Sequence, residues 1–183
     1  MEKIIHIEID KEVVDVSKNF FPKISNGAFA DPRVDLKIMD GREFLLKNEE
    51  LFDVVLVDSS DPGQGPNESL FGDDFYSLIK KQLDPNHGIL CFQAEHQWIH
   101  KKLIQELSQR CRKIFPVVKY FYTQVPTYPG GQIGFFLCSP NVQCNPLKFL
   151  KLDSKIQQSL KYYSPEIHHA AFCLPRFVEQ YLN

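Results

Sequence analysis

The sequence lacks the features that mark several classes of protein. Its apolar runs stop well short of the roughly 18 residues that a membrane span needs, and Met1-Glu2-Lys3 does not open a signal peptide. It has no basic excess, since 21 Lys and Arg stand against 23 Asp and Glu, so neither a nucleic acid nor a membrane is an expected partner. The five cysteines form no Cys-x-x-Cys pair, which argues against a disulfide framework and a zinc ribbon. We therefore expect a soluble, reduced, cytoplasmic protein.

What the chain does contain is typical of one globular domain, expected to span residues 1–183. Its residues are 43% hydrophobic and 24% charged, ordinary values for a compact domain. Strand patterns and helical patterns alternate along it. Strands are predicted over residues 3–9, 34–38, 52–57, 88–93, 117–125 and 132–138, and helices over residues 11–21, 41–47, 73–83, 97–115 and, after a polar linker, up to 181.

Some of these segments carry more specific expectations. The run 52–57 is apolar apart from Asp53 and rich in valine, which is typical of a strand buried on both faces of a parallel sheet. The helix 97–115 is expected to bury the side that carries its spaced apolar residues, Ile99, Leu103, Leu107, Cys111 and Ile114. Residues 126–131 suit a hairpin between the last two strands. Repeated strand–helix units with a closing antiparallel strand pair predict an α/β fold, a Rossmann-like sheet of the class I methyltransferase type.

Acidic residues follow the ends of four predicted strands, where ligands bind in sheets of this kind. In strand order, these strand ends carry Glu8 and Asp10, then Asp40, then Asp58 and Asp61, and finally Gln93 with Glu95. Converging carboxylates are costly unless a cation neutralises them. This edge of the sheet is therefore expected to attract a positively charged ligand.

Two of the acids have a structural interpretation beside the functional one. Glu8 suits hydrogen bonds to ribose hydroxyls, or is an exposed charge at a strand end, and the residue alone does not decide between them. Asp40 can accept from an adenine amino group while Gly41 lets the base approach the backbone. Asp40 can equally cap the helix that follows it, and without further context the cap is favoured.

The segment Asp58-Ser59-Ser60-Asp61 is the most informative. One carboxylate can take a proton from an ammonium nucleophile while the other holds the charge of the same substrate. The alternative is a loop in which the Asp and Ser side chains bond their own backbone. The functional interpretation is favoured, because an apolar strand leads directly into both acids.

Other polar and aromatic residues give weaker signals. Tyr128 lies between two prolines and is either a rigid hydrogen-bond donor or a packed aromatic. His96 and His100 are spaced i, i+4 on a predicted helix, but no further ligands accompany them, so we interpret them as solvated and predict no metal site. Tyr162 and Tyr163 are expected in the core.

A series of short segments carries a family resemblance. They are His6-Ile-Glu-Ile-Asp10, Asp40-Gly41-Arg-Glu-Phe44, Asp58-Ser-Ser-Asp-Pro62, Gly65-Pro66 with Glu68-Ser-Leu-Phe71, Gln93 with Gln97-Trp98, Phe115-Pro-Val117, Pro126-Thr-Tyr-Pro129, Gly131-Gln-Ile-Gly134, Lys161-Tyr-Tyr163 with His168, and Ala170-Ala-Phe172 with Leu174-Pro175. Each alone is weak, but in this order over nearly the whole chain they resemble the spermidine synthase family of polyamine aminopropyltransferases.

The resemblance implies an enzyme that transfers the aminopropyl group of decarboxylated S-adenosylmethionine, its co-substrate, to putrescine. It implies no prosthetic group and no metal, because a sulfonium is already a good leaving group. Asp58 would be the catalytic proton acceptor and would contact the amine together with Ser59, Ser60, Asp61, Gln93 and Tyr128. The adenosyl donor would contact Glu8, Asp40, Gly41, Pro66 and Leu70.

The sequence departs from the family pattern in two places. The loop that contains Pro66 is one residue longer than the usual Asp-Pro-x-Gly-Pro. The family's N-terminal β-hairpin domain, first strand and Gly-Gly-Gly-Asp-Gly loop are absent, so we expect an incomplete domain, truncated at its N-terminus. The strands 3–9 and 52–57 must then close the gap left by the first strand or leave backbone groups unpaired. We expect weak activity or none from the chain alone, and a homodimer or a heteromer with a full-length synthase.

Other functions stay open beside this one. A putrescine N-methyltransferase would keep much of the sequence and use S-adenosylmethionine as a methyl donor. A non-catalytic partner subunit of a full-length synthase would keep the fold without the activity. A nicotinamide dehydrogenase is less favoured, because no Gly-x-Gly-x-x-Gly precedes Glu8 and Asp58 and Asp61 would have no role.

Overall fold

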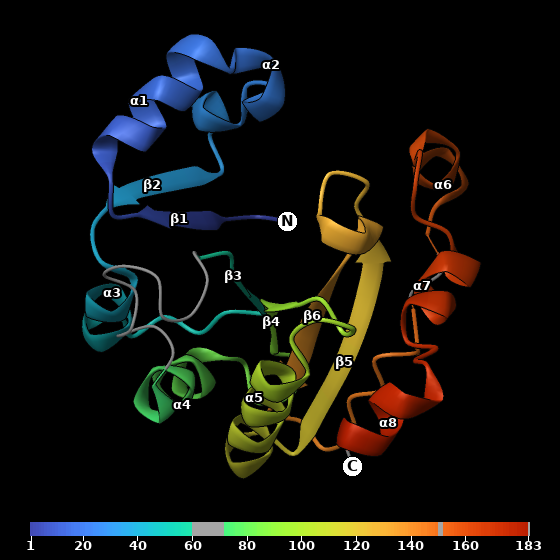
Figure 1. Cartoon of the computed structure of the whole chain (residues 1–183). Coiled ribbons are helices and arrows are strands. Elements are labelled where there is room, and N and C mark those ends of the chain that lie inside the picture. The colour runs from blue at the N-terminus through green and yellow to red at the C-terminus, as the bar shows by residue number, and fades with distance from the viewer. Residues whose placement is uncertain (60–71, 150–151, 183) are drawn as a thin grey trace. The chain divides into compact units, whose positions relative to one another are not determined.

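The computed structural model describes residues 1–59, 72–149 and 152–182, and its elements are shown in Figure 1. The chain divides into two compact units, residues 1–49 and 50–183. Its described strands form two sheets, with strand order β1-β2 in the first unit and β3-β4-β6-β5 in the second. Our expectation that residues 1–183 form a single domain stays a prediction.

The first unit is built on a two-stranded parallel sheet. Strand β1 (Ile4–Glu8) pairs with β2 (Val34–Ile38), so that Glu8 lies opposite Ile38. The chain between them forms α1 (Lys11–Phe20), α2 (Pro22–Ser25) and the 3-10 turn η1 (Ala28–Ala30), and α3 (Gly41–Lys47) follows β2. Asp10 caps α1 as predicted, since its Oδ1 accepts from the N–H of Glu12 at 2.8 Å.

The second unit is built on a mixed four-stranded sheet. Strand β3 (Val54–Val57) runs parallel to β4 (Ile89–Glu95), whereas β4 is antiparallel to β6 (Gln132–Ser139) and β6 is antiparallel to β5 (Val117–Gln124). Helix α4 (Asp73–Gln82) connects to β4, and α5 (Lys101–Ile114) connects β4 to β5. The predicted parallel strands and closing antiparallel pair are confirmed.

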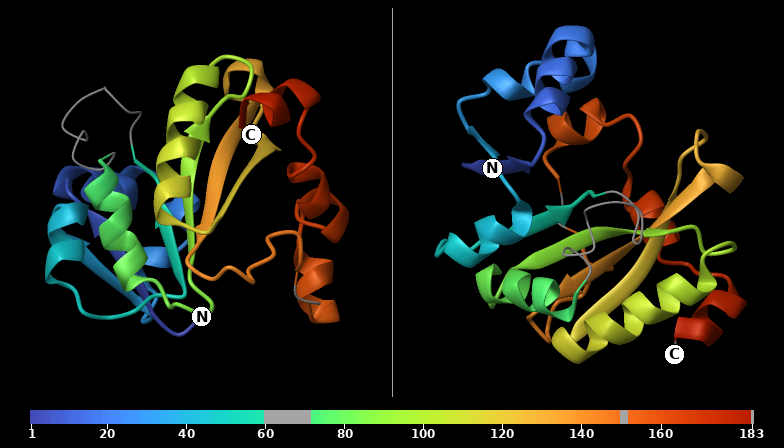
Figure 2. Two further views of the ribbon diagram at one scale, coloured as in Figure 1. Left: turned by 90° about the horizontal axis from the view of Figure 1, so that it is seen from below. Right: turned by 60° about the vertical axis from the view of Figure 1, so that its left-hand side comes forward.

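Helices cover the two faces of this sheet unequally. Helices α4 and α5 lie on one face, and α7 lies against the other at β5 (Figure 2). Strand side chains alternate between these faces. On the first face an aromatic chain runs from α4 across three strands, through Tyr76, Phe92, Phe136 and Tyr120, with ring centroids 5.1, 5.6 and 5.4 Å apart. This chain forms the centre of the buried core.

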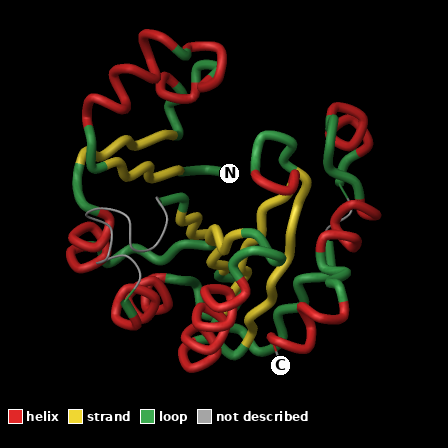
Figure 3. Tube along the Cα trace, viewed as in Figure 1, coloured by secondary structure: helices red, strands yellow, loops and turns green. Residues whose placement is uncertain are grey.

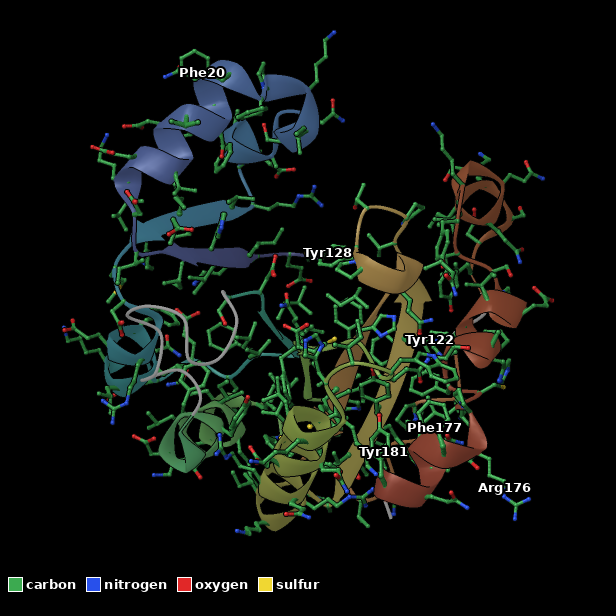
Figure 4. All side chains as sticks on the ribbon, viewed as in Figure 1. Phe20, Tyr122, Tyr128, Arg176, Phe177 and Tyr181 are labelled. Carbon is green, nitrogen blue, oxygen red and sulfur yellow. The ribbon has the colours of Figure 1, made fainter. Side chains whose placement is uncertain are left out.

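Three helices end the described chain, as the helical pattern predicted. A loop follows β6 (Figure 3), and beyond it lie α6 (Ser154–Ser159), α7 (Pro165–Ala171) and α8 (Arg176–Leu182). Helix α8 packs against α5, and Figure 4 labels Phe177 and Tyr181 on it. The Tyr181 hydroxyl donates to the carbonyl of Gln97 at 3.1 Å. Over the described ranges, each helix is too short or too polar to cross a lipid bilayer.

The prediction that strand 52–57 is buried on both faces is wrong. Strand β3 begins at Val54, and the side chains of Val54 and Leu56 are 54% and 73% exposed. The physical reason is that β3 is the edge strand of its sheet and pairs, among the described strands, with β4 on one side only. Strands β1 and β3 belong to different sheets.

The predicted helix 97–115 begins too early, and its buried side coincides only in part with the predicted one. Leu107 and Cys111 of the predicted side are buried, and Leu103 and Ile114 are half-buried. Helix α5 begins at Lys101, and the preceding residues form a turn in which the N–H groups of Ile99 and His100 donate to the carbonyl of His96. Ile99 is therefore 58% exposed, whereas Ile104, which the predicted face left out, is 0% exposed. Ile99 lies before the helix begins, which is why it does not share the buried side of Leu107 and Cys111.

The prediction that Tyr162 and Tyr163 lie in the core is also wrong. Both rings are exposed, and their hydroxyls make surface contacts instead. The Tyr162 hydroxyl lies 2.7 Å from Oγ1 of Thr123 on β5, and the Tyr163 hydroxyl lies 3.3 Å from Nδ1 of His168. A tyrosine with a polar partner at the surface gains little from burial.

Two isoleucines test the corrected helix face. Ile104→Ala should lower the free energy of unfolding by about 2–5 kcal/mol, because it leaves a cavity in the core. Ile99→Ala removes an exposed side chain and should change it by less than about 0.5 kcal/mol. Urea denaturation followed by circular dichroism measures both. Equal losses in the two variants would contradict the assignment.

Candidate functional site

In the first unit, the structure brings Glu8 and Asp40 to the same edge of a sheet. Glu8 ends β1 and pairs with Ile38 of β2, and the N–H of Met39 donates to the Glu8 carbonyl at 3.0 Å. Asp40 is the next residue. Because the two strands are parallel, both carboxylates lie at their carboxyl ends, where ligands bind in such sheets.

Each of these carboxylates uses one oxygen within the protein. Glu8 Oε1 accepts from the N–H of Asp10 at 2.8 Å, and Asp40 Oδ1 accepts from the N–H of Glu43 at 2.9 Å. Asp40 is therefore the N-cap of α3, as the sequence favoured, and Gly41 is the first residue of that helix. A carboxylate has a second oxygen with its own lone pairs. Capping and ligand binding are thus compatible at Asp40.

In the second unit, strand register brings Asp58, Gln93 and the loop that carries Tyr128 to one edge. Val57 pairs with Phe92, so Asp58 and Gln93 are each one step beyond that pair. The last pair between β5 and β6 is Gln124 with Gln132, and the Tyr128 loop joins these two residues. Because β6 is antiparallel to β4, the start of β6 and this loop lie at the carboxyl end of β4. The edge therefore gathers an acid, an amide and a phenol.

These side chains differ in how open they are to solvent. Asp58 is exposed, Ser59 and Gln93 are half-buried, and Tyr128 projects from its loop with an exposed ring (Figure 4). Such groups are within reach of a ligand that arrives from water. The other predicted site residues, Ser60, Asp61, Pro66 and Leu70, lie outside the described residues.

The Tyr128 loop is held by its own backbone. The Tyr128 N–H donates to the Val125 carbonyl at 3.0 Å, and the Tyr128 carbonyl accepts from the Gly131 N–H at 2.9 Å. The Val125 N–H donates to the Gly131 carbonyl at 2.9 Å. Gly130 and Gly131 have φ of 71° and 72°, a conformation that glycine adopts without strain. The predicted hairpin return is confirmed.

The end of β4 is shaped by a bulge and a strained residue. The register shifts between Gln93 and Glu95, and Glu95 has a φ of 63°, which is unfavourable for a residue with a Cβ. The Tyr120 hydroxyl holds this turn by donating to the Glu95 carbonyl at 2.9 Å. Burial raises the pKa of Tyr120, so the hydroxyl keeps the proton that it donates.

Gly134 makes room for that hydrogen bond. A Cβ at Gly134 would lie 1.8 Å from the Tyr120 hydroxyl oxygen and 2.6 Å from the Glu95 carbonyl oxygen. No other residue fits beside Tyr120 in this arrangement. Gly134 closes the segment Gly131-Gln-Ile-Gly134, so its packing role explains one glycine of that segment.

The interpretation of His96 as a solvated helix residue is wrong. His96 lies in the turn between β4 and α5 and is 7% exposed, and His100 is the N-cap residue of α5. His100 Nδ1 lies 3.4 Å from Oε2 of Glu95. No group of three or more His, Cys, Asp or Glu side chains within the described ranges could hold a metal ion. The i, i+4 spacing of His96 and His100 suggested a helix, but the helix begins at Lys101, five residues after His96.

Comparisons with known proteins bear on this arrangement. A family model described as "Spermine/spermidine synthase domain" matches residues 1–149. The chain is 40% identical over its whole length to a spermine synthase of Saccharomyces cerevisiae, and 46% identical to a spermidine synthase of Coffea arabica. It covers 63% of the yeast protein and 60% of the coffee protein. The chain thus spans about 60% of the length of these relatives.

Solved structures agree with the fold. The whole chain matches 61% of a spermidine synthase in complex with the transition-state analogue AdoDATO, with a TM-score of 0.86 and 29% identity. It also matches 60% of the spermidine synthase of Thermotoga maritima, with a TM-score of 0.82 and 29% identity. The class I methyltransferase-like fold predicted from the sequence is confirmed by these matches.

The role of Asp40 as the cap of α3 can be tested by substitution. Asp40→Ala removes the cap of α3 and should lower the free energy of unfolding by about 1 kcal/mol. Asp40→Asn keeps an oxygen that accepts from the Glu43 N–H and should leave stability within a few tenths of a kcal/mol of wild type, about the difference among good caps. Thermal denaturation measures both variants. If Asp40→Asn lowers the free energy of unfolding as much as Asp40→Ala does, Asp40 stabilises the unit by its charge and not as a cap.

Proposed function

The chain belongs to the spermine/spermidine synthase family, and on that premise we propose that it transfers an aminopropyl group from decarboxylated S-adenosylmethionine to putrescine. The products are spermidine and methylthioadenosine. The observation that carries the proposal is the placement of Asp58, Gln93 and the Tyr128 loop at one sheet edge. Both proposed substrates are cations, and an accessible carboxylate at that edge suits them electrostatically.

In the proposed reaction, Asp58 acts as the general base. Its carboxylate takes a proton from one ammonium group of putrescine, which frees the nitrogen lone pair. That nitrogen attacks the propyl carbon bound to the sulfonium, so a C–N bond forms as the C–S bond breaks. The bonding electrons go to sulfur, which leaves as the neutral thioether of methylthioadenosine. The protein then supplies orientation and one proton transfer.

The remaining residues of the edge would hold the diamine. Gln93 offers an amide oxygen and Tyr128 a phenolic oxygen, and both accept from ammonium groups. Ser59, Ser60 and Asp61 follow Asp58 in the chain, and Asp61 would hold the charge of the second ammonium group. In this division Asp58 takes the proton and Asp61 holds the charge of the amine.

The donor would bind at the carboxylates of the first unit. Glu8 would accept from the ribose hydroxyls and Asp40 from the adenine amino group, with Gly41, Pro66 and Leu70 near the base. Support comes from the second oxygen of each carboxylate, which has its own lone pairs beside the hydrogen bond accepted by the first. It comes also from the related spermidine synthase, which is in complex with the transition-state analogue AdoDATO.

Spermidine is the second candidate acceptor. The relatives include spermine synthases of Saccharomyces cerevisiae and Arabidopsis thaliana, 40% and 44% identical to this chain, beside the spermidine synthases. The two acceptors share the aminopropyl donor and the proton transfer. Spermidine is longer than putrescine by one aminopropyl group, so the two acceptors require amine sites of different length.

The direct test measures methylthioadenosine release by chromatography. The chain is incubated with decarboxylated S-adenosylmethionine and either putrescine or spermidine, and the polyamine product is identified by mass spectrometry. We expect one methylthioadenosine per aminopropylated amine. A methylated amine formed from S-adenosylmethionine, or no methylthioadenosine with either acceptor, would contradict the proposal. The weak activity, the homodimer or heteromer with a full-length synthase, and the cytoplasmic location expected from the sequence stay predictions.

The role of Asp58 is tested with a matched aspartate on the same segment. Asp58→Asn should lower the turnover number by about 10²–10⁴-fold, because the amide cannot take the proton. Donor affinity, measured by calorimetry, should stay unchanged. Asp53 precedes β3 and its side chain is exposed, so Asp53→Asn should leave turnover near wild type. Equal effects of the two substitutions would rule out a specific role for Asp58.

A further inference from the structure

His96 occupies a buried turn directly after the strand that carries Gln93. Its side chain is 7% exposed, and it follows the strained residue Glu95. The N–H of Trp98 donates to Nδ1 of His96 at 3.2 Å. A ring nitrogen that accepts a hydrogen bond carries no proton, so the proton of the neutral ring is on Nε2. The ring is therefore fixed on one side, with an N–H on the other.

The Nε2 edge of this ring faces Gly130, two residues after Tyr128. A Cβ at Gly130 would lie 2.5 Å from Nε2, 3.0 Å from Cε1 and 3.3 Å from Cδ2 of His96. Nε2 is buried and has no hydrogen-bond partner among the described residues. An unpaired buried donor is unfavourable and persists only where the surrounding structure fixes it. Here the Nε2 edge of the ring occupies the space that a side chain at Gly130 would need.

The neighbouring residue makes a second connection to the same loop. Gln97 is buried, and its Nε2 donates to Oε1 of Gln132 at 2.6 Å. Gln132 is the first residue of β6, directly after Gly131. The turn after β4 thus contacts the Tyr128 loop at two places, Gly130 within the loop and Gln132 directly after it.

We propose that His96 is a positioning residue, whose buried ring supports Gly130 and thereby sets the conformation of the loop that presents Tyr128. The part of Tyr128 in amine binding rests on the proposed function, whereas the support of the loop does not. His96 acts through Gly130 and does not itself contact the substrate. Its removal should therefore weaken amine binding without abolishing the chemical step.

The two adjacent glycines provide a matched pair for the test. Gly130 and Gly131 have nearly the same φ, 71° and 72°, but a Cβ at Gly131 would meet no atom within 4 Å. Gly131→Ala therefore measures the backbone strain alone, and Gly130→Ala measures the same strain together with the clash against His96. His96→Asn keeps an oxygen for the Trp98 N–H and removes the far edge of the ring. Each glycine variant is made with His96 and with Asn at that position.

Amide hydrogen exchange, read by NMR, follows the Tyr128 and Gly131 amides in each variant. We expect exchange about tenfold faster in Gly130→Ala than in Gly131→Ala, within the range of coupling between contacting residues. With His96→Asn the two alanine variants should become equal. In turnover assays, Gly130→Ala should raise the KM for the amine about tenfold relative to Gly131→Ala and leave the KM for the donor within about twofold.

Each outcome decides the proposal. Equal exchange in the two alanine variants, or a difference that His96→Asn does not remove, would overturn the support of the loop by His96. Coupled exchange with an unchanged KM for the amine would overturn the positioning of Tyr128. If wild type transfers no aminopropyl group, the proposed function fails, and the exchange measurements still decide whether His96 sets the loop.

Discussion

The ladder between β4 and β6 is the interaction on which the amine part of the candidate site depends. Because β4 is parallel to β3 and antiparallel to β6, its carboxyl end meets both the strand that leads to Asp58 and the loop that carries Tyr128. A slip of one residue would turn Gln93 toward the core. Phe92 and Phe136 pair across this ladder with ring centroids 5.6 Å apart, and their burial fixes the register.

Local signals in the sequence predicted the elements that local interactions define. The cap at Asp10 and the cap at Asp40 were both expected from residue type, and strand 34–38 and helix 41–47 have the predicted bounds. The acids at strand ends follow from the same reasoning, since a parallel sheet gathers its carboxyl ends at one edge. The placement of Glu8 and Asp40 at the edge of one sheet, and of Asp58 and Gln93 at the edge of the other, is predictable to that extent without a structure, whereas their roles stay predictions.

Features that depend on distant parts of the chain were not predictable in this way. The exposure of Leu56 depends on which strands flank β3, and no local pattern contains that information. The burial of His96 could not be predicted, because its four-residue spacing from His100 suggests a helix, whereas both residues precede the first residue of α5. The need for glycine at position 134 is set by Tyr120, which is distant in sequence and occupies the space that a Cβ at Gly134 would need.

In the described part of the second unit, the positive-φ residues lie around the edge where the amine is proposed to bind. Glu95, Gly130 and Gly131 all adopt left-handed conformations there, and Glu95 does so at the cost of steric strain. Such a residue persists only where its surroundings over-determine it. The Tyr120 hydrogen bond and the buried turn of His96 and Gln97 supply that constraint. The core thus holds the turn and the turn supports the loop, so the edge is ordered before a ligand arrives, and less binding energy is lost in ordering it.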